Sequence, residues 1–266
     1  MVPKALTIAG SDSGGGAGLQ ADLKTFTALG VYGMSAITSI TVQNTVGVYD
    51  FLDVPPHMVY KQIRVVAEDI GVDACKTGML SNEEIIRHVA KAIREFKLHR
   101  FVLDPVMRAK SGDPLLKQSA RESLIRELIP LAMVVTPNIP EAEELCGFEI
   151  KSPKDMEMAC KHIHALGCSA VVLKGGHREG KEAIDILYDG SSFEYLRGKY
   201  VRTKNTHGTG CTFSSAITAY LAKGFDLKES VRRAKEYVQG AIESSLSIGR
   251  GHGPLNHMWL HYSFNT

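Results

Sequence analysis

A glycine-containing turn at residues 205–211, with the sequence Asn-Thr-His-Gly-Thr-Gly-Cys, has the residue types of an anion-binding site. From Phe213 onward, apolar residues recur at three- and four-residue spacing, which predicts a helix. The first N–H groups of such a helix, with the positive end of its dipole, would face whatever occupies the turn. Because Gly208 and Gly210 lack side chains, a phosphate would approach the backbone closely there. A glycine-rich turn before an ordinary core helix is the alternative, and this run alone would favour it.

Phosphoryl transfer requires phosphate clamps, a metal site and a positioned nucleophile, and the chain offers residues for each. Lys174 directly follows an apolar run and would neutralise phosphate charge as a point cation. Asp104, Glu141 and Asp185 carry oxygen ligands of the kind that Mg²⁺ accepts, directly or through retained waters. Each residue alone is better explained as a solvated charge at the end of a strand. The four together on one edge of a sheet would be harder to explain in that way.

Cys211 closes the turn and would stand at the start of the helix. A helix N-terminus lowers the pKa of a thiol, so we expect a thiolate near neutral pH that acts as a general base. A small residue that only packs is the alternative for this position. For Gly210 we expect a backbone conformation that disfavours any residue with a Cβ atom.

Three short apolar runs, at residues 100–105, 133–138 and 170–176, each end in polar, proline or glycine residues. Helical stretches separate them, a pattern typical of βαβ units with parallel strands. In an open α/β sheet, ligands bind at the carboxyl ends of the strands. We therefore expect the polar residues that follow these strands to meet near the glycine turn. These residues are Asp104, Asn138 and Lys174.

The rest of the chain predicts further strands and helices. Residues 6–9 indicate a buried strand, and the glycine-rich run 10–18 after it matches neither nucleotide-loop template. This run is either a close approach of backbone to ligand or a flexible turn. Residues 183–188 and 193–196 flank Asp-Gly, which predicts an antiparallel hairpin. Strands are also expected over 34–41 and 46–54, a strand followed by a turn is expected over 73–80, and helices are expected over 19–29, over 58–70 and after the cap Asn82.

Length and composition limit the classes of protein. The 266 residues fit one large α/β domain or two small ones, and the absence of a linker or a shift in composition favours one domain, 1–266. A net charge of +2 does not call for a nucleic-acid or anionic membrane partner. The five scattered cysteines predict neither a disulfide framework nor a zinc site, and favour a reducing compartment. With no signal peptide or membrane span predicted, we expect a cytoplasmic protein.

Four motifs in this order resemble the hydroxymethylpyrimidine kinase/phosphomethylpyrimidine kinase family of thiamin synthesis, a branch of the ribokinase-like fold. They are residues 104–113, residues 136–141, residues 174–177 and residues 205–211. The resemblance extends over nearly the whole chain, from the glycine-rich run 10–18 to residues 249–254. It implies a three-layer α/β sandwich with a mostly parallel central sheet, helices on both faces and an antiparallel edge.

The resemblance also implies an activity and a site. The family phosphorylates the hydroxymethyl group of 4-amino-5-hydroxymethyl-2-methylpyrimidine with ATP and Mg²⁺, and then phosphorylates the monophosphate. Its implied partners are this small molecule and ATP, without nucleic acid or membrane, in a homodimer. The pyrimidine would lie among Gly10, Asp22, Val42, Gln43, Met79 and Val106. ATP and its metal would use Asn138, Lys174, Asp185 and Thr209, with Asp104 and Glu141 for the metal. Gly208, Gly210, Lys174 and Cys211 would carry the catalysis.

Two rival interpretations stay open. Pyridoxal kinase shares the fold and the ring size. Some members carry a cysteine in the segment over the phosphates, where this chain has Met-Arg-Ala-Lys at 107–110, which disfavours that rival. Arg108 departs from the apolar residue more usual in the family. A catalytically idle pyrimidine- or nucleotide-binding regulator is the non-enzyme alternative, and the intact set of phosphate-binding and acidic residues disfavours it.

Overall fold

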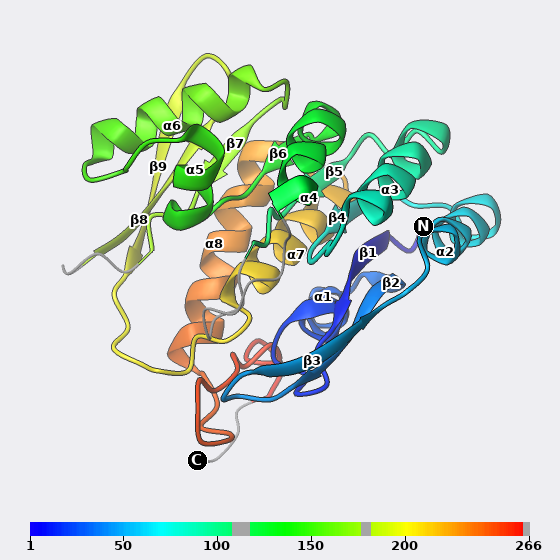
Figure 1. Ribbon diagram of the computed structural model, residues 1–266. Helices are drawn as coiled ribbons and strands as arrows, with labels where there is room; N and C mark the ends of the chain where they lie inside the picture. The colour runs from blue at the N-terminus through cyan, green and yellow to red at the C-terminus, as the bar shows by residue number, and fades with distance from the viewer. Residues whose placement is uncertain (108–117, 177–181, 263–266) are drawn as a thin grey trace.

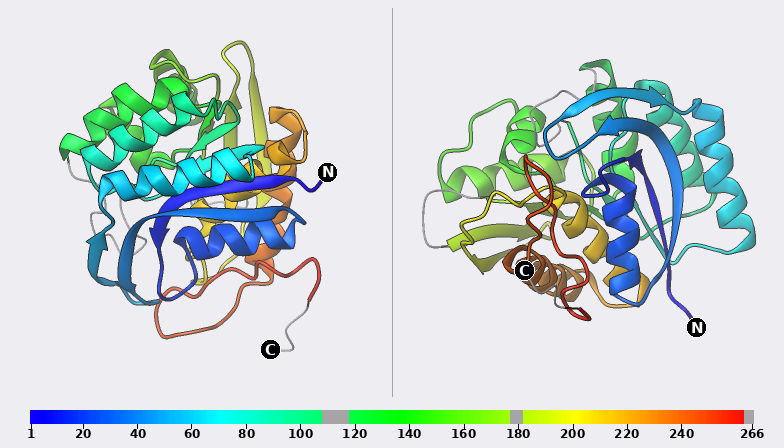
Figure 2. Two further views of the ribbon diagram at one scale, coloured as in Figure 1. Left: turned by 90° about the vertical axis from the view of Figure 1, so that its right-hand side faces the viewer. Right: turned by 90° about the horizontal axis from the view of Figure 1, so that it is seen from below.

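The computed structural model describes residues 1–107, 118–176 and 182–262. The strands among them form one nine-stranded sheet in the order β3-β2-β1-β4-β5-β6-β7-β8-β9. They are β1 Lys4–Ser11, β2 Tyr32–Gln43, β3 Val48–Asp53, β4 Ala74–Thr77, β5 Phe101–Leu103, β6 Val134–Val135, β7 Val171–Leu173, β8 Glu182–Tyr188 and β9 Phe193–Lys199. The α-helices are α1 Gly18–Ala28, α2 Pro56–Asp69, α3 Glu83–Glu95, α4 Gln118–Ser123, α5 Ile139–Cys146, α6 Pro153–Ala165, α7 Thr209–Ala222 and α8 Leu227–Glu243. Figures 1 and 2 show helices on both faces of the sheet.

The central strands are parallel and the antiparallel strands lie at the two edges. All neighbouring pairs from β2 to β7 run parallel. At one edge β8 and β9 form the hairpin expected from the sequence, and β8 also runs antiparallel to β7. At the other edge β3 runs antiparallel to β2, which adds a second antiparallel border. The expected three-layer α/β fold with a mostly parallel sheet is confirmed.

Alternation along the strands divides the apolar core into two layers. Leu6 and Ile8 of β1 pack into the layer under α2 to α6, whereas Ala5 of the same strand packs into the layer under α1, α7 and α8. Leu103 and Val102 of β5 divide in the same way. Successive side chains of a strand point to opposite faces, so these short apolar runs are buried on both sides.

Local signals place most helix starts. Asn82 caps α3 by accepting a hydrogen bond from the N–H of Ile85, as expected. The strands expected at residues 100–105, 133–138 and 170–176 contribute only two or three residues each to the sheet, and beyond them Asn138 and Lys174 form an isolated parallel bridge. Across the described residues, no helix combines the length and the apolar character needed to cross a membrane.

Candidate active site

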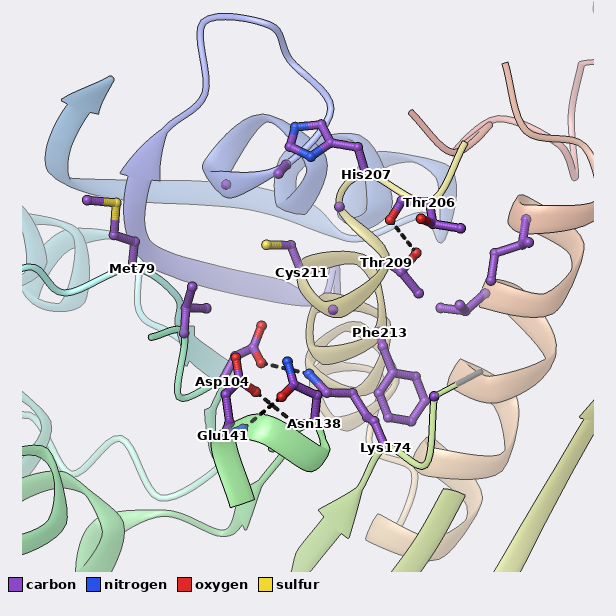
Figure 3. A pocket seen from close by; sticks show the side chains of 18 of the residues that line it. Met79, Asp104, Asn138, Glu141, Lys174, Thr206, His207, Thr209, Cys211 and Phe213 are labelled. Carbon is purple, nitrogen blue, oxygen red and sulfur yellow. Dashed lines mark hydrogen bonds and ion pairs between the residues drawn. The ribbon is translucent and has the colours of Figure 1, made fainter. Parts of the chain in front are cut away.

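A cavity of about 480 Å³ lies where the parallel strands end and α7 begins. Figure 3 shows side chains from several elements pointing into it. Asp104, Asn138 and Lys174, which follow β5, β6 and β7, line one part of the cavity together with residues 208–211. The prediction that these polar residues meet at the carboxyl edge of the sheet is therefore confirmed.

The glycine turn before α7 packs against the glycine-rich run after β1. Gly208 is the N-cap of α7, with a left-handed φ of 82°. A Cβ atom there would lie 1.9 Å from the carbonyl oxygen of Gly16, so a side chain is excluded by the neighbouring loop. The expectation of an unusual conformation at Gly210 is wrong, because this residue lies in the first turn of the helix without a positive φ. An added Cβ at Gly210 would instead lie 3.2 Å from Nζ of Lys174.

The start of α7 is open to an anion from the cavity. No side chain caps it, and Gly208, Thr209 and Gly210 all line the cavity. The Thr209 hydroxyl donates to the carbonyl oxygen of Thr206 at 2.8 Å, which orders the turn (Figure 3). The N–H of Thr209 donates to the carbonyl oxygen of Thr206 at 3.3 Å, so the following N–H groups of the first turn and the dipole of a fourteen-residue helix face the cavity beside Lys174.

Lys174 and Asp104 form a buried ion pair in the wall of the cavity. Nζ of Lys174 lies 3.1 Å from Oδ1 of Asp104 (Figure 3). Burial lowers the pKa of Lys174, but the carboxylates of Asp104 and Glu141 outweigh it and the pKa is raised. Burial raises the pKa of Asp104, but the charges of Lys174 and Lys76 outweigh it and the pKa is lowered. Both partners are therefore charged at neutral pH.

Asn138 and Glu141 form a capping box at the start of α5. The Asn138 side chain accepts from the N–H of Glu141 at 2.9 Å, and Oε2 of Glu141 accepts from the N–H of Asn138 at 2.8 Å. Burial raises the pKa of Glu141 to about 7, and the charge of Asp104 adds to this effect against the opposing charge of Lys174. A divalent cation beside it would restore the carboxylate.

Asp104 and Glu141 both line the cavity, which fits the pair proposed from the sequence for the metal. Within the described ranges, no group of three or more His, Cys, Asp or Glu side chains is arranged to hold a metal ion. Mg²⁺ keeps several waters and takes few protein ligands, so two carboxylates beside bound phosphates are sufficient for it.

Asp185 ties the loop after β7 to α8. Its Oδ1 accepts from the N–H of Gly175 at 3.0 Å, and its Oδ2 accepts from Nζ of Lys235 at 2.7 Å. Both carboxylate oxygens thus have protein partners, although the residue lines the cavity. Lys235 also lines the cavity. Its place in the amphipathic helix α8 did not indicate from the sequence that it would lie at the site.

Four of the residues assigned to the pyrimidine line the far part of the cavity. They are Gly10, Gln43, Met79 and Val106. At Gly10, an added Cβ would lie 3.1 Å from the sulfur of Met79, so a larger residue would narrow the cavity. Val42 is not part of the wall, and the residue is 57% exposed on β2.

Asp22 is not among the residues that line the cavity, and its assignment to the substrate stays a prediction. Its carboxylate is fully buried and lies 3.0 Å from Nζ of Lys76, which is also fully buried. The hydroxyls of Thr7 and Ser215 donate to it at 2.6 Å each. This network joins α1, β1, β4 and α7 beneath the cavity, so Asp22 holds the elements that carry the site.

The thiol of Cys211 is neutral in this structure, contrary to the expected thiolate. Burial raises its pKa to about 12; Lys76 and the N–H of Gly18 lower it, while Asp22 and Asp104 raise it further. The helix N-terminus is present as expected, but removal of the sulfur from water has the larger effect on the pKa. The sulfur points into the cavity between Met79 and the glycine turn (Figure 3).

Sequence reasoning missed the residues that hold the two glycine loops together. Asp12 accepts hydrogen bonds from the N–H groups of Gly14, Gly16 and Ala17, and Nε2 of His207 donates to it at 2.9 Å. An aspartate whose side chain accepts hydrogen bonds from the backbone N–H groups two to five residues later is typical of a turn. The run Ser-Asp-Ser-Gly at residues 11–14 could therefore have predicted this role for Asp12. Lys76 had only a weak signal, as a charged residue within the strand expected at the start of residues 73–80.

Part of the resemblance falls on residues that the structure does not describe. Arg108, the run 109–113 and His177 lie outside the described residues. The expectations for these residues stay predictions.

The chain is similar to known proteins over nearly its whole length. A family model for phosphomethylpyrimidine kinase matches residues 12–256. A hydroxymethylpyrimidine/phosphomethylpyrimidine kinase of Bacillus subtilis is 49% identical over 99% of this chain and 98% of its own length. The thiamine biosynthesis bifunctional protein of Geobacter sulfurreducens is 50% identical over 95% of this chain, which spans 52% of that protein. An ADP complex of Bacillus subtilis pyridoxal kinase superposes with a TM-score of 0.90 at 44% identity, over 98% of this chain and 99% of that one.

Proposed function

Because this chain belongs to the phosphomethylpyrimidine kinase family, we propose that it phosphorylates 4-amino-5-hydroxymethyl-2-methylpyrimidine with ATP and then phosphorylates the monophosphate, as a step of thiamin synthesis. One observation carries the proposal. A single cavity holds an open helix N-terminus with the Lys174–Asp104 pair in one part, and the amide of Gln43 with Met79 in another. The first part suits phosphates and the second suits a small polar ring.

The reaction moves one phosphoryl group in each step. In the first step an O–P bond forms between the hydroxymethyl oxygen and the γ-phosphorus, the bond to ADP breaks, and the hydroxyl proton leaves. In the second step an oxygen of the monophosphate attacks, and near neutral pH this oxygen carries no proton to remove. The start of α7 and Lys174 would stabilise the charge on the transferring group in both steps.

The test compares kcat/KM for the pyrimidine and for pyridoxal in the same preparation. We expect the pyrimidine to be preferred. Pyridoxal kinase is the second candidate because the solved pyridoxal kinase shares this fold at a TM-score of 0.90. A preference for pyridoxal would replace the proposed function with that candidate.

Replacing Gln43 by leucine tests the substrate assignment. We propose that the amide pairs with the ring nitrogen and the exocyclic amine of the aminopyrimidine, as amides read adenine edges. Its loss leaves both substrate groups unpaired, which costs roughly 1–3 kcal/mol, or about 5- to 150-fold in affinity. Calorimetry should show this loss for the pyrimidine and unchanged affinity for ATP, which is the internal control. Equal pyrimidine affinity in variant and parent would remove Gln43 from the binding site.

We propose that Mg²⁺ is held near Asp104 and Glu141, largely through its waters. When bound, the ion would supply positive charge that neutralises the phosphates. Glu141→Gln should therefore raise the Mg²⁺ concentration needed for half-maximal rate. Because the pKa of Glu141 is raised to about 7, the ionised fraction of this side chain increases as pH rises from 6 to 8. The parent should therefore need less Mg²⁺ at the higher pH, and Glu141→Gln should lose this dependence on pH.

Glu143→Gln on the same helix is the matched control for the metal titration. Its side chain accepts from the N–H of Ile150, which a glutamine can also do, and it does not line the cavity. If Glu141→Gln and the control have the same metal titration as the parent, the ion is instead held by Asp104 or Asp185.

We also propose that the protein is a homodimer of the cytoplasm. Apolar side chains are exposed on β2 and on the edge strand β3, namely Ile40 at 52%, Val42 at 57%, Tyr49 at 63% and Leu52 at 71%. A second copy would cover this border, which is otherwise an open sheet edge. Sedimentation equilibrium should give twice the chain mass of 29.0 kDa, and a monomer mass would contradict the assembly.

All five cysteines are free thiols, which fits the reducing compartment expected for a cytoplasmic protein.

A further inference from the structure

The hairpin of β2 and β3 projects beyond the body of the sheet. Pairing of β2 with β1 ends at Ile40, which pairs with Ser11, whereas β2 stays paired with β3 beyond this point. Residues 41–48, here called the hairpin tip, therefore lie past the last backbone pair with β1. Thr41 and Gln43 of the tip line the cavity. The position of this part of the cavity wall thus depends on contacts outside the sheet.

Three consecutive residues near the C-terminus, Gly251, His252 and Gly253, hold the hairpin tip and are here called the strap. The N–H of Gly251 donates to Oγ1 of Thr45 at 3.2 Å, and the N–H of His252 donates to the Thr45 carbonyl oxygen at 2.8 Å. The carbonyl oxygen of Gly253 accepts from the N–H of His207 at 3.1 Å. Figure 1 shows the orange-red segment that contains the strap beside the tip of the hairpin.

The strap meets both loops next to residues that line the cavity. It holds the hairpin tip two residues after Gln43, and it holds the glycine turn at His207, directly before the N-cap Gly208. The ring of His252 adds a further contact, since its Nδ1 lies 3.1 Å from the carbonyl oxygen of Lys204. The strap therefore joins the wall proposed for the pyrimidine to the turn proposed for the phosphates.

Both glycines of the strap lie too close to their neighbours for a side chain. An added Cβ at Gly251 would lie 1.9 Å from the carbonyl oxygen of Thr45, and one at Gly253 would lie 2.3 Å from Oδ1 of Asn205. The first of these is a main-chain atom, so rotation of a side chain cannot relieve the clash. A residue larger than glycine at position 251 must therefore displace the hairpin tip or the strap.

We propose that the strap fixes the acceptor side of the cavity against the phosphate side, so that the γ-phosphoryl group passes to the pyrimidine hydroxyl rather than to water. The inference rests on the proposed function and names residues that select its acceptor. A misplacement of the reacting groups by about 1 Å costs on the order of 10²-fold in rate. Water is not held by the hairpin tip, so a displaced tip slows only the transfer to the pyrimidine.

The two competing reactions break the same bond, between the γ-phosphorus and ADP. In the transfer, an O–P bond forms from the hydroxymethyl oxygen, which loses its proton. In hydrolysis, an O–P bond forms from a water oxygen, and inorganic phosphate and a proton are released. The start of α7 and Lys174 would serve both reactions, whereas the hairpin tip would serve only the first. The ratio of phosphorylated pyrimidine to inorganic phosphate therefore reports the position of the tip.

The test measures this product ratio at saturating ATP and pyrimidine, in the parent and in variants on both sides of the contact. Gly251→Ala should lower the ratio ~10²-fold, because the clash moves the tip. Thr45→Val removes only the hydroxyl that accepts from Gly251 and should lower the ratio about 3- to 10-fold. Thr45→Ser keeps the hydroxyl and should stay within about twofold of the parent. Calorimetry should give an affinity for ADP within about threefold of the parent for Thr45→Val, whose substitution leaves the glycine turn unaltered.

Gly224→Ala is the matched control for stability. Gly224 lies outside the cavity with a φ of 90°, and an added Cβ would meet no atom within 4 Å. Its positive φ should lower the midpoint of thermal unfolding and leave the product ratio unaltered. Thr45→Val introduces no main-chain clash, so it decides the outcome if Gly251→Ala does not fold.

A parental product ratio in Thr45→Val and in folded Gly251→Ala would overturn the role of the strap while leaving the proposed function standing. An equal fall in Gly224→Ala would also overturn it, since the effect would then follow from stability alone. A parent that forms inorganic phosphate but no phosphorylated pyrimidine would overturn the proposed function, and this inference with it.

Discussion

Replacing Lys174 by methionine should lower the turnover number by ~10³-fold, the size of effect expected when a main electrostatic contact to a transferring group is lost. Nζ of Lys174 lies at the cavity wall, 3.1 Å from Asp104 and beside the open start of α7. Without it the buried carboxylate of Asp104 would lose its nearest compensating charge, and its repulsion of the phosphates would increase. Steady-state rates at saturating ATP and acceptor give the comparison.

Lys174→Arg is the control for charge. The guanidinium keeps the cation but differs in shape, so this variant should recover part of the rate while remaining slower than the parent. Thermal unfolding of each variant separates a folding defect from a catalytic one. A folded methionine variant with less than tenfold loss would show that Lys174 is not a phosphate clamp.

Cys211→Ala should slow the first phosphorylation by ~10²-fold or more, within the usual range for a general base, and should slow the second step far less. The hydroxymethyl oxygen must lose a proton as it attacks, whereas the phosphate oxygen near neutral pH has none to lose. Separate single-turnover rates with the alcohol and with its monophosphate measure the two effects in one protein. Equal losses in both steps would mean that Cys211 packs and is not a base.

The raised pKa of Cys211 gives this role a pH dependence. A thiol with a pKa of about 12 is almost entirely protonated at pH 7, so the thiolate fraction increases about tenfold for each unit of pH below that value. The first step should therefore accelerate from pH 7 to 9 in the parent. Cys211→Asp carries a base that is already ionised, so its rate should exceed that of the alanine variant and vary little over this range. A flat profile in the parent would contradict the thiolate requirement.

The meeting of Asp104, Asn138 and Lys174 could be predicted because it follows from strand direction alone. Apolar runs that end in polar residues mark the carboxyl ends of parallel strands, and all such ends meet at one edge. The capping box of Asn138 and Glu141 is equally local. The hairpin of β8 and β9 needed only the Asp-Gly turn between two alternating runs.

The errors in the site arose where residues far apart in the chain meet. The constrained conformation was expected at Gly210, but it is found at Gly208, where Gly16, almost two hundred residues earlier, lies against the turn. The buried partner of Asp22 in α1 is Lys76 in β4, a contact that the sequence did not indicate. The pKa of Cys211 depends on how much protein surrounds the sulfur, whereas the chain alone shows only the helix start. Local patterns specify elements and their ends, and packing decides which side chains face the cavity.

The most direct test of the account is the identity of the products. The protein is incubated with ATP, Mg²⁺ and either the aminopyrimidine or pyridoxal, and the products are identified by mass over time while ADP is counted. The account predicts that the pyrimidine monophosphate forms first and is then converted to the pyrophosphate, with one ADP released for each phosphoryl group. Phosphorylated pyridoxal together with an unchanged pyrimidine would contradict it.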